Sequence, residues 1–410
     1  MLRPHPTSTV LVVNSGSSSL KYKVFAAAVA AGEESGWLAA GSVERIGDAA
    51  SQLTHRRPGA APSTTRAQVP DHAAAVAAML AALTQHGPDA SDIVAVGHRV
   101  VHGGDRFTEP TVVDVAVVAA LEALTPLAPL HNPVNLDCLR AVREALPGVI
   151  HVAAFDTAFH ATLPPQARTY ALPRDLAERH GIRRWGFHGI SHSFVTRRAA
   201  HALEVLPADV RLVICHIGNG VSVTAVAAGR SVDTSMGMTP LEGLVMGTRC
   251  GDIDPAVIPY LVRETGQSAD EVEALLNHDS GLQGLCGDSD VRSVRSRAEA
   301  GDAAARLALE VYSYRLRKYV GAYLAVVAKP HAVVFTGGVG ENDPQTRAAV
   351  VGPLGHLGLR LDSDANTAVH GSEKPVRIDD GSGAIPLLVV PTDEELEIAH
   401  LTWRLISASA

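Results

Sequence analysis

The sequence predicts an α/β protein built from two globular domains. Strand-like apolar runs alternate with segments of helical periodicity along the chain. Two hairpins with glycine turns are expected near residues 10–25 and 212–227, and a third glycine turn stands between a strand and a helix start. The chain has 410 residues, 46% apolar and 19% charged, which is enough for two domains of roughly 150–250 residues each.

Charge and composition exclude several classes of protein. The net charge is −8 and no basic run is present, so the field of the protein repels nucleic acids and anionic lipid surfaces. Residues 1–10 lack the apolar core of a signal peptide, and the richest apolar stretch, 112–124, is interrupted by Asp114 and Glu122. The four cysteines are widely spaced with no CxxC pair, as in reduced proteins. We expect a cytoplasmic protein with no nucleic-acid or membrane partner.

The first hairpin begins with the β-branched run at 10–13, turns through the polar residues 14–19 and resumes at 20–25. Such a turn exposes backbone N–H groups and hydroxyls, and the lysine that follows, Lys21, can meet negative charge. The pattern suits a polyphosphate, although an ordinary hairpin gives the same signal.

The second hairpin repeats this arrangement. The apolar run 212–215 leads into the turn 216–220 and a second strand at 221–227. Placing Gly16 on Gly218 aligns strand with strand. The repeat predicts two related domain halves.

The third glycine turn has a different setting. Leu307, Val311 and Tyr314 fit the spacing of one helical face. A strand at 332–336 and a glycine turn at 337–341 follow. Asn342 is expected to be the N-cap of the next helix, with Pro344 in its first turn. A strand, a glycine turn and a helix N-terminus together favour a nucleotide site.

Two further segments complete the organisation. The polar stretch Asp48 to His72 has little periodicity and is expected to be a peripheral excursion. Asp393 is expected to cap a C-terminal helix that runs from Glu394 to about Ile406. Glu394 then either complements the helix dipole or serves a site.

Several familiar sites are excluded by inspection. The chain has no Gly-Lys dipeptide of a Walker A loop, no GxSxG, no HExxH and no complete GxGxxG after a strand. His188 and His192 have the i,i+4 spacing of a helical metal pair, with glycines that indicate a turn entering a helix. A zinc site is the weaker interpretation there, because no nearby cysteine or carboxylate completes it.

Three charged residues are placed as candidates for chemistry. Arg99 and Arg249 are flanked by glycines, which suits bidentate capture of a carboxylate or phosphate, with a structural ion pair as the alternative. Asp156 ends an apolar strand, as an active-site carboxylate or a cap.

The motifs resemble the acetate kinase family in order over nearly the whole chain. The segments that carry the resemblance are 14–22, 97–104, 155–160, 187–192, 216–220, 233–255, 335–342 and 392–396. It departs from the family pattern at Asp393, where Asn is frequent, and at Ile190, where Thr is common.

The resemblance implies a duplicated actin/hexokinase/Hsp70-like fold, with ATP bound in the interdomain cleft and Mg²⁺ required. It divides the chain into a lobe of residues 1–157 plus 390–410 and a lobe of residues 158–389. The implied reaction is direct in-line phosphoryl transfer from ATP to acetate, giving acetyl phosphate and ADP. A homodimer is the family expectation.

The resemblance also assigns residues. Arg99 would bind the acyl carboxylate, Arg249 and His188 would stabilise the transferring phosphoryl group, and Asp156 would be the essential carboxylate. Magnesium, or Mn²⁺ as an alternative ion, would be held by Asn14 and Glu394. The acetate methyl would lie against Val101, Leu130, Phe187 and Pro240. ATP or ADP would be bound by Ser17, Ser19, Lys21, His216, Ile217, Gly218, Asn219, Gly220, Asp290, Val291, Arg292, Gly338, Val339, Gly340, Glu341 and Asn342.

Two questions remain open at the level of sequence. A propionate or butyrate kinase is the nearest alternative, since one methylene changes discrimination by only about 1–3 kcal/mol. A nucleotide-gated protein of the actin or chaperone type is a different class, but it would not need Arg99, Asp156, His188 and Arg249. Because acetate has no proton to lose at neutral pH, we expect Asp156 to orient Arg99 or the magnesium waters.

Overall fold

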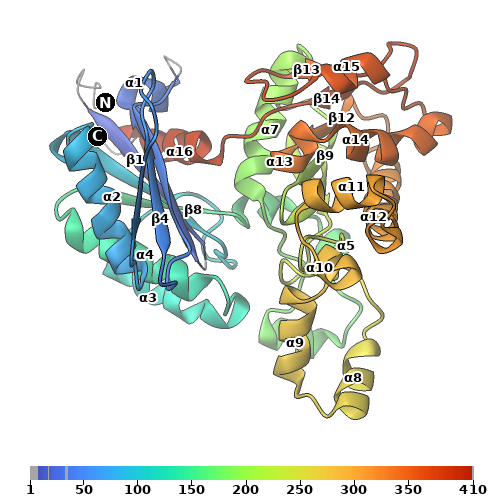
Figure 1. The fold of residues 1–410 in the computed structure, drawn as a ribbon, viewed down its shortest axis with the longest axis horizontal. Coiled ribbons are helices and arrows are strands. Elements are labelled where there is room, and N and C mark those ends of the chain that lie inside the picture. Colours follow the sequence, from blue (N-terminus) through green and yellow to red (C-terminus); the bar gives the residue numbers. More distant parts are fainter. Residues whose placement is uncertain (1–7, 17, 33–35, 409–410) are drawn as a thin grey trace. The chain divides into compact units, whose positions relative to one another are not determined.

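The structure, a computed structural model, describes residues 8–16, 18–32 and 36–408. The chain divides into two compact units, Met1–Ala158 with Asp393–Ala410, and Phe159–Thr392 (Figure 1). The chain passes from the first unit to the second after Ala158 and returns to the first after Thr392. Within the described ranges, no helix combines the length and the apolar character that a membrane span requires.

The first unit is built on an eight-stranded sheet of order β5-β4-β3-β2-β1-β6-β8-β7. β1 is antiparallel to β2 and parallel to β6, and β6 is parallel to β8. The strands are β1 (Thr9–Gly16), β2 (Ser19–Ala26), β3 (Ala39–Glu44), β4 (Ser51–Arg56), β5 (Ser63–Ala67), β6 (Ile93–Val100), β7 (Thr111–Val112) and β8 (Ile150–Phe155).

The second unit is built on a six-stranded sheet of order β11-β10-β9-β12-β14-β13. β9 is antiparallel to β10 and parallel to β12, and β12 is parallel to β14. The strands are β9 (Leu212–Ile217), β10 (Val221–Ala227), β11 (Arg230–Thr234), β12 (Ala332–Thr336), β13 (Val376–Arg377) and β14 (Leu387–Val389).

The two sheets share one topology. The order β3-β2-β1-β6-β8-β7 corresponds strand by strand to β11-β10-β9-β12-β14-β13, and each ends in an antiparallel edge strand. The glycine-turn hairpins β1/β2 and β9/β10 occupy equivalent positions. The α/β class and the two related halves predicted from the repeat are confirmed.

β4 and β5 extend the first sheet only, at its edge, and they lie in the segment expected to be a peripheral excursion. The sequence did not indicate that two strands form there. All five residues of β5 are exposed, so its sequence has no apolar alternation to read. The strand is held by backbone pairing with β4 rather than by a buried face.

Helices cover both faces of the first sheet. The helices of this unit are α1 (Ala27–Ala30), α2 (His72–His86), α3 (Val115–Ala123), α4 (Asn132–Ala145) and α16 (Glu394–Ala408). Val96 of β6 is buried in the core that includes α2 and α4, through residues such as Met79 and Cys138. A Cβ on the next residue, Gly97, would lie 2.6 Å from atoms of Ile398 in α16. Successive residues of a strand face opposite sides, so α16 covers the other face.

The start of α16 agrees with the prediction. The backbone N–H of Leu396 donates to the Asp393 carboxylate at 2.9 Å, which makes Asp393 its cap. Glu394 and Glu395 therefore stand in the first helical turn.

The second unit carries the remaining helices. They are α5 (Pro165–Arg168), α6 (Arg174–His180), α7 (Gly189–Ala202), α8 (Val257–Thr265), α9 (Ala269–His278), α10 (Gly281–Cys286), α11 (Val291–Glu299), α12 (Ala303–Val327), α13 (Gly337–Asn342), α14 (Pro344–Val351) and α15 (Ser363–Ala368). The predicted helix around 307–314 is part of α12. Its buried side includes Tyr312 and Leu316, whereas Leu307 and Tyr314 are 55% and 56% exposed. The face predicted from the spacing of Leu307 and Tyr314 is therefore a surface of the unit.

The prediction of Asn342 as an N-cap was wrong. Gly337 to Asn342 form the short helix α13, and the cap of α14 is Asp343, whose carboxylate accepts from Gln345 and Thr346. Asp caps as well as Asn does, and Asp343 directly precedes Pro344 at the first helical position.

Candidate active site

The turn of the first hairpin brings Asn14 and Lys21 together. The two residues are paired in the β1/β2 register, so both lie beside the turn. Ser19, which begins β2, is half-buried at the same turn. Ser17 lies outside the described residues.

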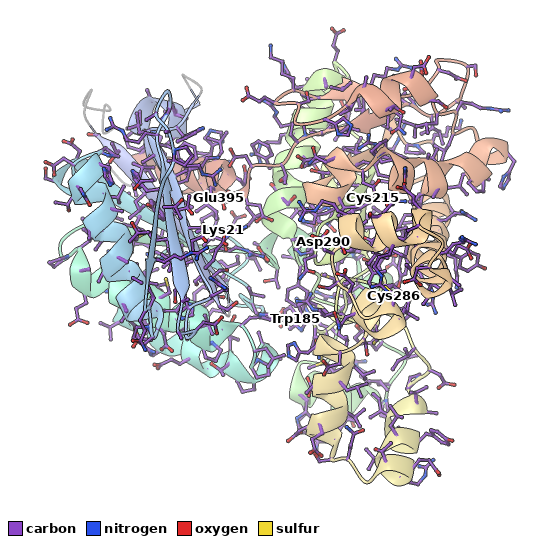
Figure 2. All side chains as sticks on the ribbon, in the orientation of Figure 1. Lys21, Trp185, Cys215, Cys286, Asp290 and Glu395 are labelled. Atoms are coloured by element: carbon purple, nitrogen blue, oxygen red, sulfur yellow. The ribbon has the colours of Figure 1, made fainter. Side chains whose placement is uncertain are left out.

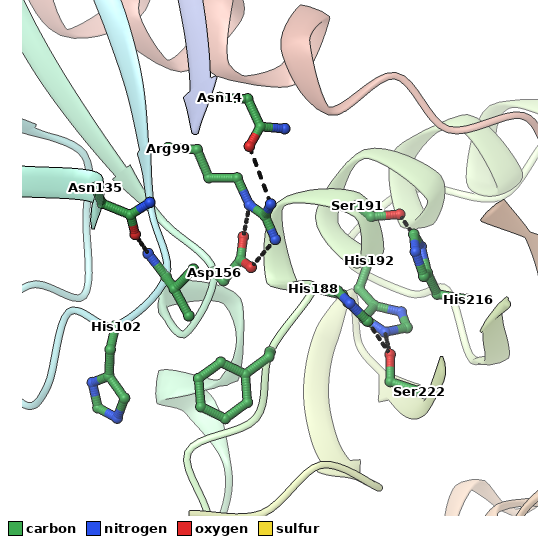
Figure 3. A network of polar contacts seen from close by, with 12 residues as sticks. Asn14, Arg99, His102, Asn135, Asp156, His188, Ser191, His192, His216 and Ser222 are labelled. Carbon is green, nitrogen blue, oxygen red and sulfur yellow. Dashed lines mark hydrogen bonds and ion pairs between the residues drawn. The ribbon is translucent and has the colours of Figure 1, made fainter. Parts of the chain in front are cut away.

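Arg99 and Asp156 come from the ends of two neighbouring parallel strands. β6 and β8 are in register up to Val100 and Phe155, which places Asp156 beside Arg99. The guanidinium donates from Nε to Asp156 Oδ1 at 3.0 Å and from Nη2 to Oδ2 at 2.5 Å (Figure 3). Asp156 is buried and Arg99 is mostly buried. Burial opposes the charge of Arg99, but the Asp156 carboxylate outweighs it and raises the pKa of Arg99 above its ordinary value.

Asn14 fixes the other end of the guanidinium. Arg99 Nη1 donates to Asn14 Oδ1 at 3.1 Å. Together with the two bonds to Asp156, this uses three of the five N–H groups of an arginine. Within the described part of the chain, one N–H on each terminal nitrogen remains for a planar ligand such as a carboxylate.

Acidic side chains from α16 join this group. Asn14 Nδ2 donates to Glu395 Oε1 at 3.4 Å. Burial, together with the charges of Asp156 and Glu395, raises the pKa of Glu394 to about 7, while Arg99 acts in the opposite direction. Figure 2 labels Lys21 and Glu395 in this unit. The crowding of like charges and the oxygen donors of Asn14 and Glu394 fit a hard cation such as Mg²⁺.

Val101, one of the residues predicted to contact the acetate methyl, is held by neighbouring polar groups. The Val101 N–H donates to Asn135 Oδ1 at 3.0 Å, and Asn135 Nδ2 donates to the Ser15 carbonyl at 2.9 Å. Asn135, from α4, thus ties the segment after β6 to the β1 turn. Sequence reasoning missed it, because a single Asn in a helical pattern carries no signal. Leu130 is 46% exposed.

In the second unit, His188 and Arg249 converge on the turn of the second hairpin. His188 is the N-cap of α7, with φ +57°, which confirms the predicted turn into a helix. A Cβ built on Gly220 would lie 3.2 Å from His188 Nε2 and 3.5 Å from Arg249 Nη1. The tips of both side chains therefore point to one place above Gly220, where a Cβ on that residue would force the His188 ring to shift and would contact Arg249.

The loop that carries Arg249 is fastened to the same hairpin. The Gly247 N–H donates to the Asn219 carbonyl at 3.2 Å, and Arg249 Nη1 donates to the Pro240 carbonyl at 3.4 Å. Phe187 is buried, and its carbonyl lies 2.9 Å from His160 Nε2. The structure thus brings Pro240 to Arg249 and places Phe187 directly before His188.

A cavity of about 640 Å³ lies beside the glycine turns of this unit. It is lined by Gly218, Asn219, Ser289, Asp290, Val291, Arg292, Gly338, Val339, Asn342 and Asp343. Its size is that of a small-molecule site. Eight of these ten residues are among the predicted nucleotide residues, and Ser289 and Asp343 were missed. Asp290 caps α11 and pairs with the exposed Arg292 at 2.6 Å.

The other predicted nucleotide residues do not line the cavity. His216 and Ile217 are buried in β9, and Gly220 lies in the turn beside His188. Gly340 is buried in α13. Glu341 accepts from the N–H groups of Gly337, at 2.9 Å, and Thr392, at 3.0 Å. Through these contacts Glu341 stabilises the turn that leads into α13.

Arg347, which no motif indicated, binds backbone carbonyls of α13. Its side chain is fully buried and donates from Nη1 to the carbonyls of Gly340 and Glu341, both at 2.9 Å. It also donates to both oxygens of Asn366, at 2.7 and 2.6 Å. Burial lowers the pKa of Arg347 to about 10, so it stays charged at neutral pH. A cation at the carbonyl end of α13 stabilises that end of the helix.

Comparison with known proteins identifies the family. Residues 9–400 match the family described as the acetokinase family. The chain belongs to the acetokinase family. It is 52% identical over 406 residues to an acetate kinase from Leifsonia xyli, covering 98% of this chain and 100% of the relative. It is 50% identical over 408 residues to one from Streptomyces avermitilis, covering 98% of each.

Solved structures of this family share the fold. The crystal structure of Porphyromonas gingivalis acetate kinase is similar with a TM-score of 0.89 and 41% identity, over 97% of this chain and 100% of that one. A propionate kinase from Francisella tularensis gives a TM-score of 0.91 and 36% identity, over 97% and 99%. The acetokinase resemblance noted in the motifs is confirmed.

Proposed function

We propose that this chain transfers the γ-phosphoryl group of ATP reversibly to acetate, giving ADP and acetyl phosphate. The observation that carries the proposal is Arg99, held by Asp156 and Asn14 so that one N–H on each terminal nitrogen remains for a carboxylate. The relatives of about half-identical sequence, named as acetate kinases, support the same reaction.

The second unit supplies what the phosphoryl donor needs. The cavity beside the glycine turns offers backbone N–H groups and the ends of α11 and α13 to a nucleotide. His188 and Arg249 meet above Gly220, next to the second hairpin. Both can donate hydrogen bonds to the oxygens of a phosphoryl group, where negative charge is spread in the transition state.

The work of the enzyme is positioning and charge neutralisation. An acyl carboxylate is a weak nucleophile and is repelled by a triphosphate, so it must be held in line with the phosphoryl group. Arg99 would orient the carboxylate, and Arg249 and His188 would accept the charge of the transferred group. Mg²⁺, held by Asn14 and Glu394, would neutralise phosphate charge when bound.

Asp156 serves this reaction as a positioning group. Both of its oxygens accept from Arg99, so its carboxylate is occupied in orienting the guanidinium. Acetate at neutral pH carries no proton for it to remove. Asp156 therefore fixes the plane in which Arg99 presents its two remaining donors.

The test is formation of acyl phosphate, trapped with hydroxylamine as the hydroxamate, with ATP, Mg²⁺ and acetate, propionate or butyrate in parallel. Acetate should turn over, and Arg99→Ala and Arg99→Lys should both lose about 10³-fold or more, because a point charge does not replace the planar fork. Arg140→Ala is the matched control, since Arg140 is a half-exposed arginine of the same unit that pairs with Glu122. Nucleotide binding without hydroxamate from any acid would instead support a nucleotide-gated binding protein.

Propionate is the second candidate substrate. The similarity to a structure described as a propionate kinase favours it. The ratio of kcat/KM for acetate and propionate decides between them.

We also propose a homodimer that covers the exposed face of α12. Leu307 and Tyr314, seven residues apart and so on one face of this helix, are each about half-exposed, and adjacent exposed apolar groups are typical of interaction surfaces. Analytical ultracentrifugation should show a dimer that Leu307→Glu with Tyr314→Glu converts to a monomer. A wild-type monomer at micromolar concentration contradicts the dimer.

A further inference from the structure

Four histidines gather in the second unit, and two of them, His160 and His192, have no part in the proposed reaction. The ring centroids of His188 and His216 are 4.4 Å apart, those of His160 and His192 5.7 Å, and those of His192 and His216 6.1 Å. His192 is fully buried on α7, one helical turn after His188. Its role beside His188 follows from the hydrogen bonds that its ring makes.

A buried hydroxyl joins the two. Ser222 of β10 is fully buried, and its Oγ lies 3.0 Å from His188 Nδ1 and 2.8 Å from His192 Nε2 (Figure 3). A serine hydroxyl has a single proton. If it accepted from both imidazoles, its own buried proton would have no acceptor among the described residues. The hydroxyl therefore donates to one ring and accepts from the other, so the direction of one bond sets the direction of the second.

The direction follows from His192. Burial, with the neighbouring His160 and His216, lowers the pKa of His192 well below its ordinary value, so the ring is neutral and has one N–H. Its Nδ1 is buried with no hydrogen-bond partner among the residues that the structure describes. Buried N–H groups are almost always paired. The single N–H therefore stands on Nε2 and donates to Ser222.

Ser222 then donates its proton to His188 Nδ1, which leaves the His188 proton on Nε2. We propose that His192 and Ser222 are positioning residues that hold His188 as the Nε2–H tautomer, with this N–H directed at the transferring phosphoryl group. The inference rests on the role proposed for His188 in phosphoryl transfer. Nε2 is the ring nitrogen that lies 3.2 Å from a Cβ built on Gly220, and Arg249 Nη1 lies 3.5 Å from the same point. In the other tautomer it would present a lone pair to phosphoryl oxygens and repel them.

The tautomer can be measured without activity. In the full chain labelled with ¹⁵N-histidine, long-range ¹H–¹⁵N correlations distinguish a protonated from an unprotonated ring nitrogen, and His188 is assigned by its absence in His188→Ala. We expect His188 to carry its proton on Nε2 in the nucleotide-free protein. A proton on Nδ1 would overturn the proposal, whatever acid the enzyme phosphorylates.

Kinetics of relay variants give a second readout. Ser222→Ala and His192→Leu should each lower kcat about tenfold, with KM for ATP and acetate within about twofold, because His188 loses its orientation and not its place. His192→Gln keeps an amide N–H near the position of Nε2 and should retain kcat within about threefold.

Thr224→Val is the matched control. Thr224 lies on the same strand and is equally buried, but its hydroxyl pairs with Thr234 Oγ1 at 2.9 Å, so kcat and the His188 signals should stay as in the wild type. Wild-type kcat and unchanged His188 signals in folded Ser222→Ala would refute the relay. Absence of acetyl phosphate formation by the wild type would refute the proposed function instead, and the tautomer would still be read from the spectra.

Discussion

Replacement of Asp156 by Asn tests whether this carboxylate orients Arg99 or moves a proton. Asn keeps one oxygen that can accept from the guanidinium but loses the second acceptor and the negative charge. In the structure Asp156 is 1% exposed and makes two bonds to Arg99, at 3.0 and 2.5 Å. Loss of one buried hydrogen bond between charged groups amounts to about 1.5–3 kcal/mol.

If this energy is lost from the transition state, kcat/KM for acetate falls roughly 10- to 150-fold in Asp156→Asn. The hydroxamate assay, run from pH 6 to 8, should show a parallel loss at every pH. Because Asp156 acts through Arg99, the double variant Arg99→Gln/Asp156→Asn should be no worse than Arg99→Gln alone. Denaturant unfolding of each variant separates a loss of catalysis from a loss of fold.

Two results would refute this reasoning. A new limb in the pH–rate profile of Asp156→Asn between pH 6 and 8 would assign a proton-transfer role to the carboxylate. Additive losses in the double variant would mean that Asp156 acts independently of Arg99.

Three further outcomes follow from the structure. His98 and His151 are buried and bonded to each other at 2.9 Å, and burial lowers the pKa of His151 to about 4. Below about pH 6.5, the ordinary pKa of histidine, His151 therefore binds a proton in the unfolded chain but not in the native state. Through this residue the unfolding free energy should fall by about 2 kcal/mol as the pH is lowered from 7.5 to 5. His151→Gln should flatten that dependence in denaturant titrations, and an unchanged slope would contradict the argument. Gly220→Ala should fold normally yet lower kcat about 10- to 100-fold, since its methyl would push the His188 ring out of place and contact the tip of Arg249; a wild-type kcat would show that the two side chains do not meet there. Arg347→Met should destabilise the protein by about 3 kcal/mol and raise KM for ATP, because buried carbonyls of α13 lose their donor; an increase in the unfolding midpoint would contradict it.

Much of the fold was readable from the sequence, because the signals are local. The two glycine-turn hairpins, the turn before α7 and the cap at Asp393 each depend on a few adjacent residues with strong backbone preferences. The same locality explains the failures. β5 has no buried face to give alternation, and Asn342 and Asp343 are equivalent caps until Gly337 to Asn342 are known to be helical.

The motifs by themselves identified the candidate functional residues, and their resemblance to the acetokinase family assigned roles to these residues. Only the tertiary structure decided what each one touches. Strand register sets Asp156 against Arg99, although 57 residues separate them in the chain. Ser222 lies between two histidines, and Arg347 lies behind α13, because sheet order and helix packing bring distant segments together. Buried polar groups must find partners, and those partners depend on the packed chain as a whole, which no short pattern of residues contains.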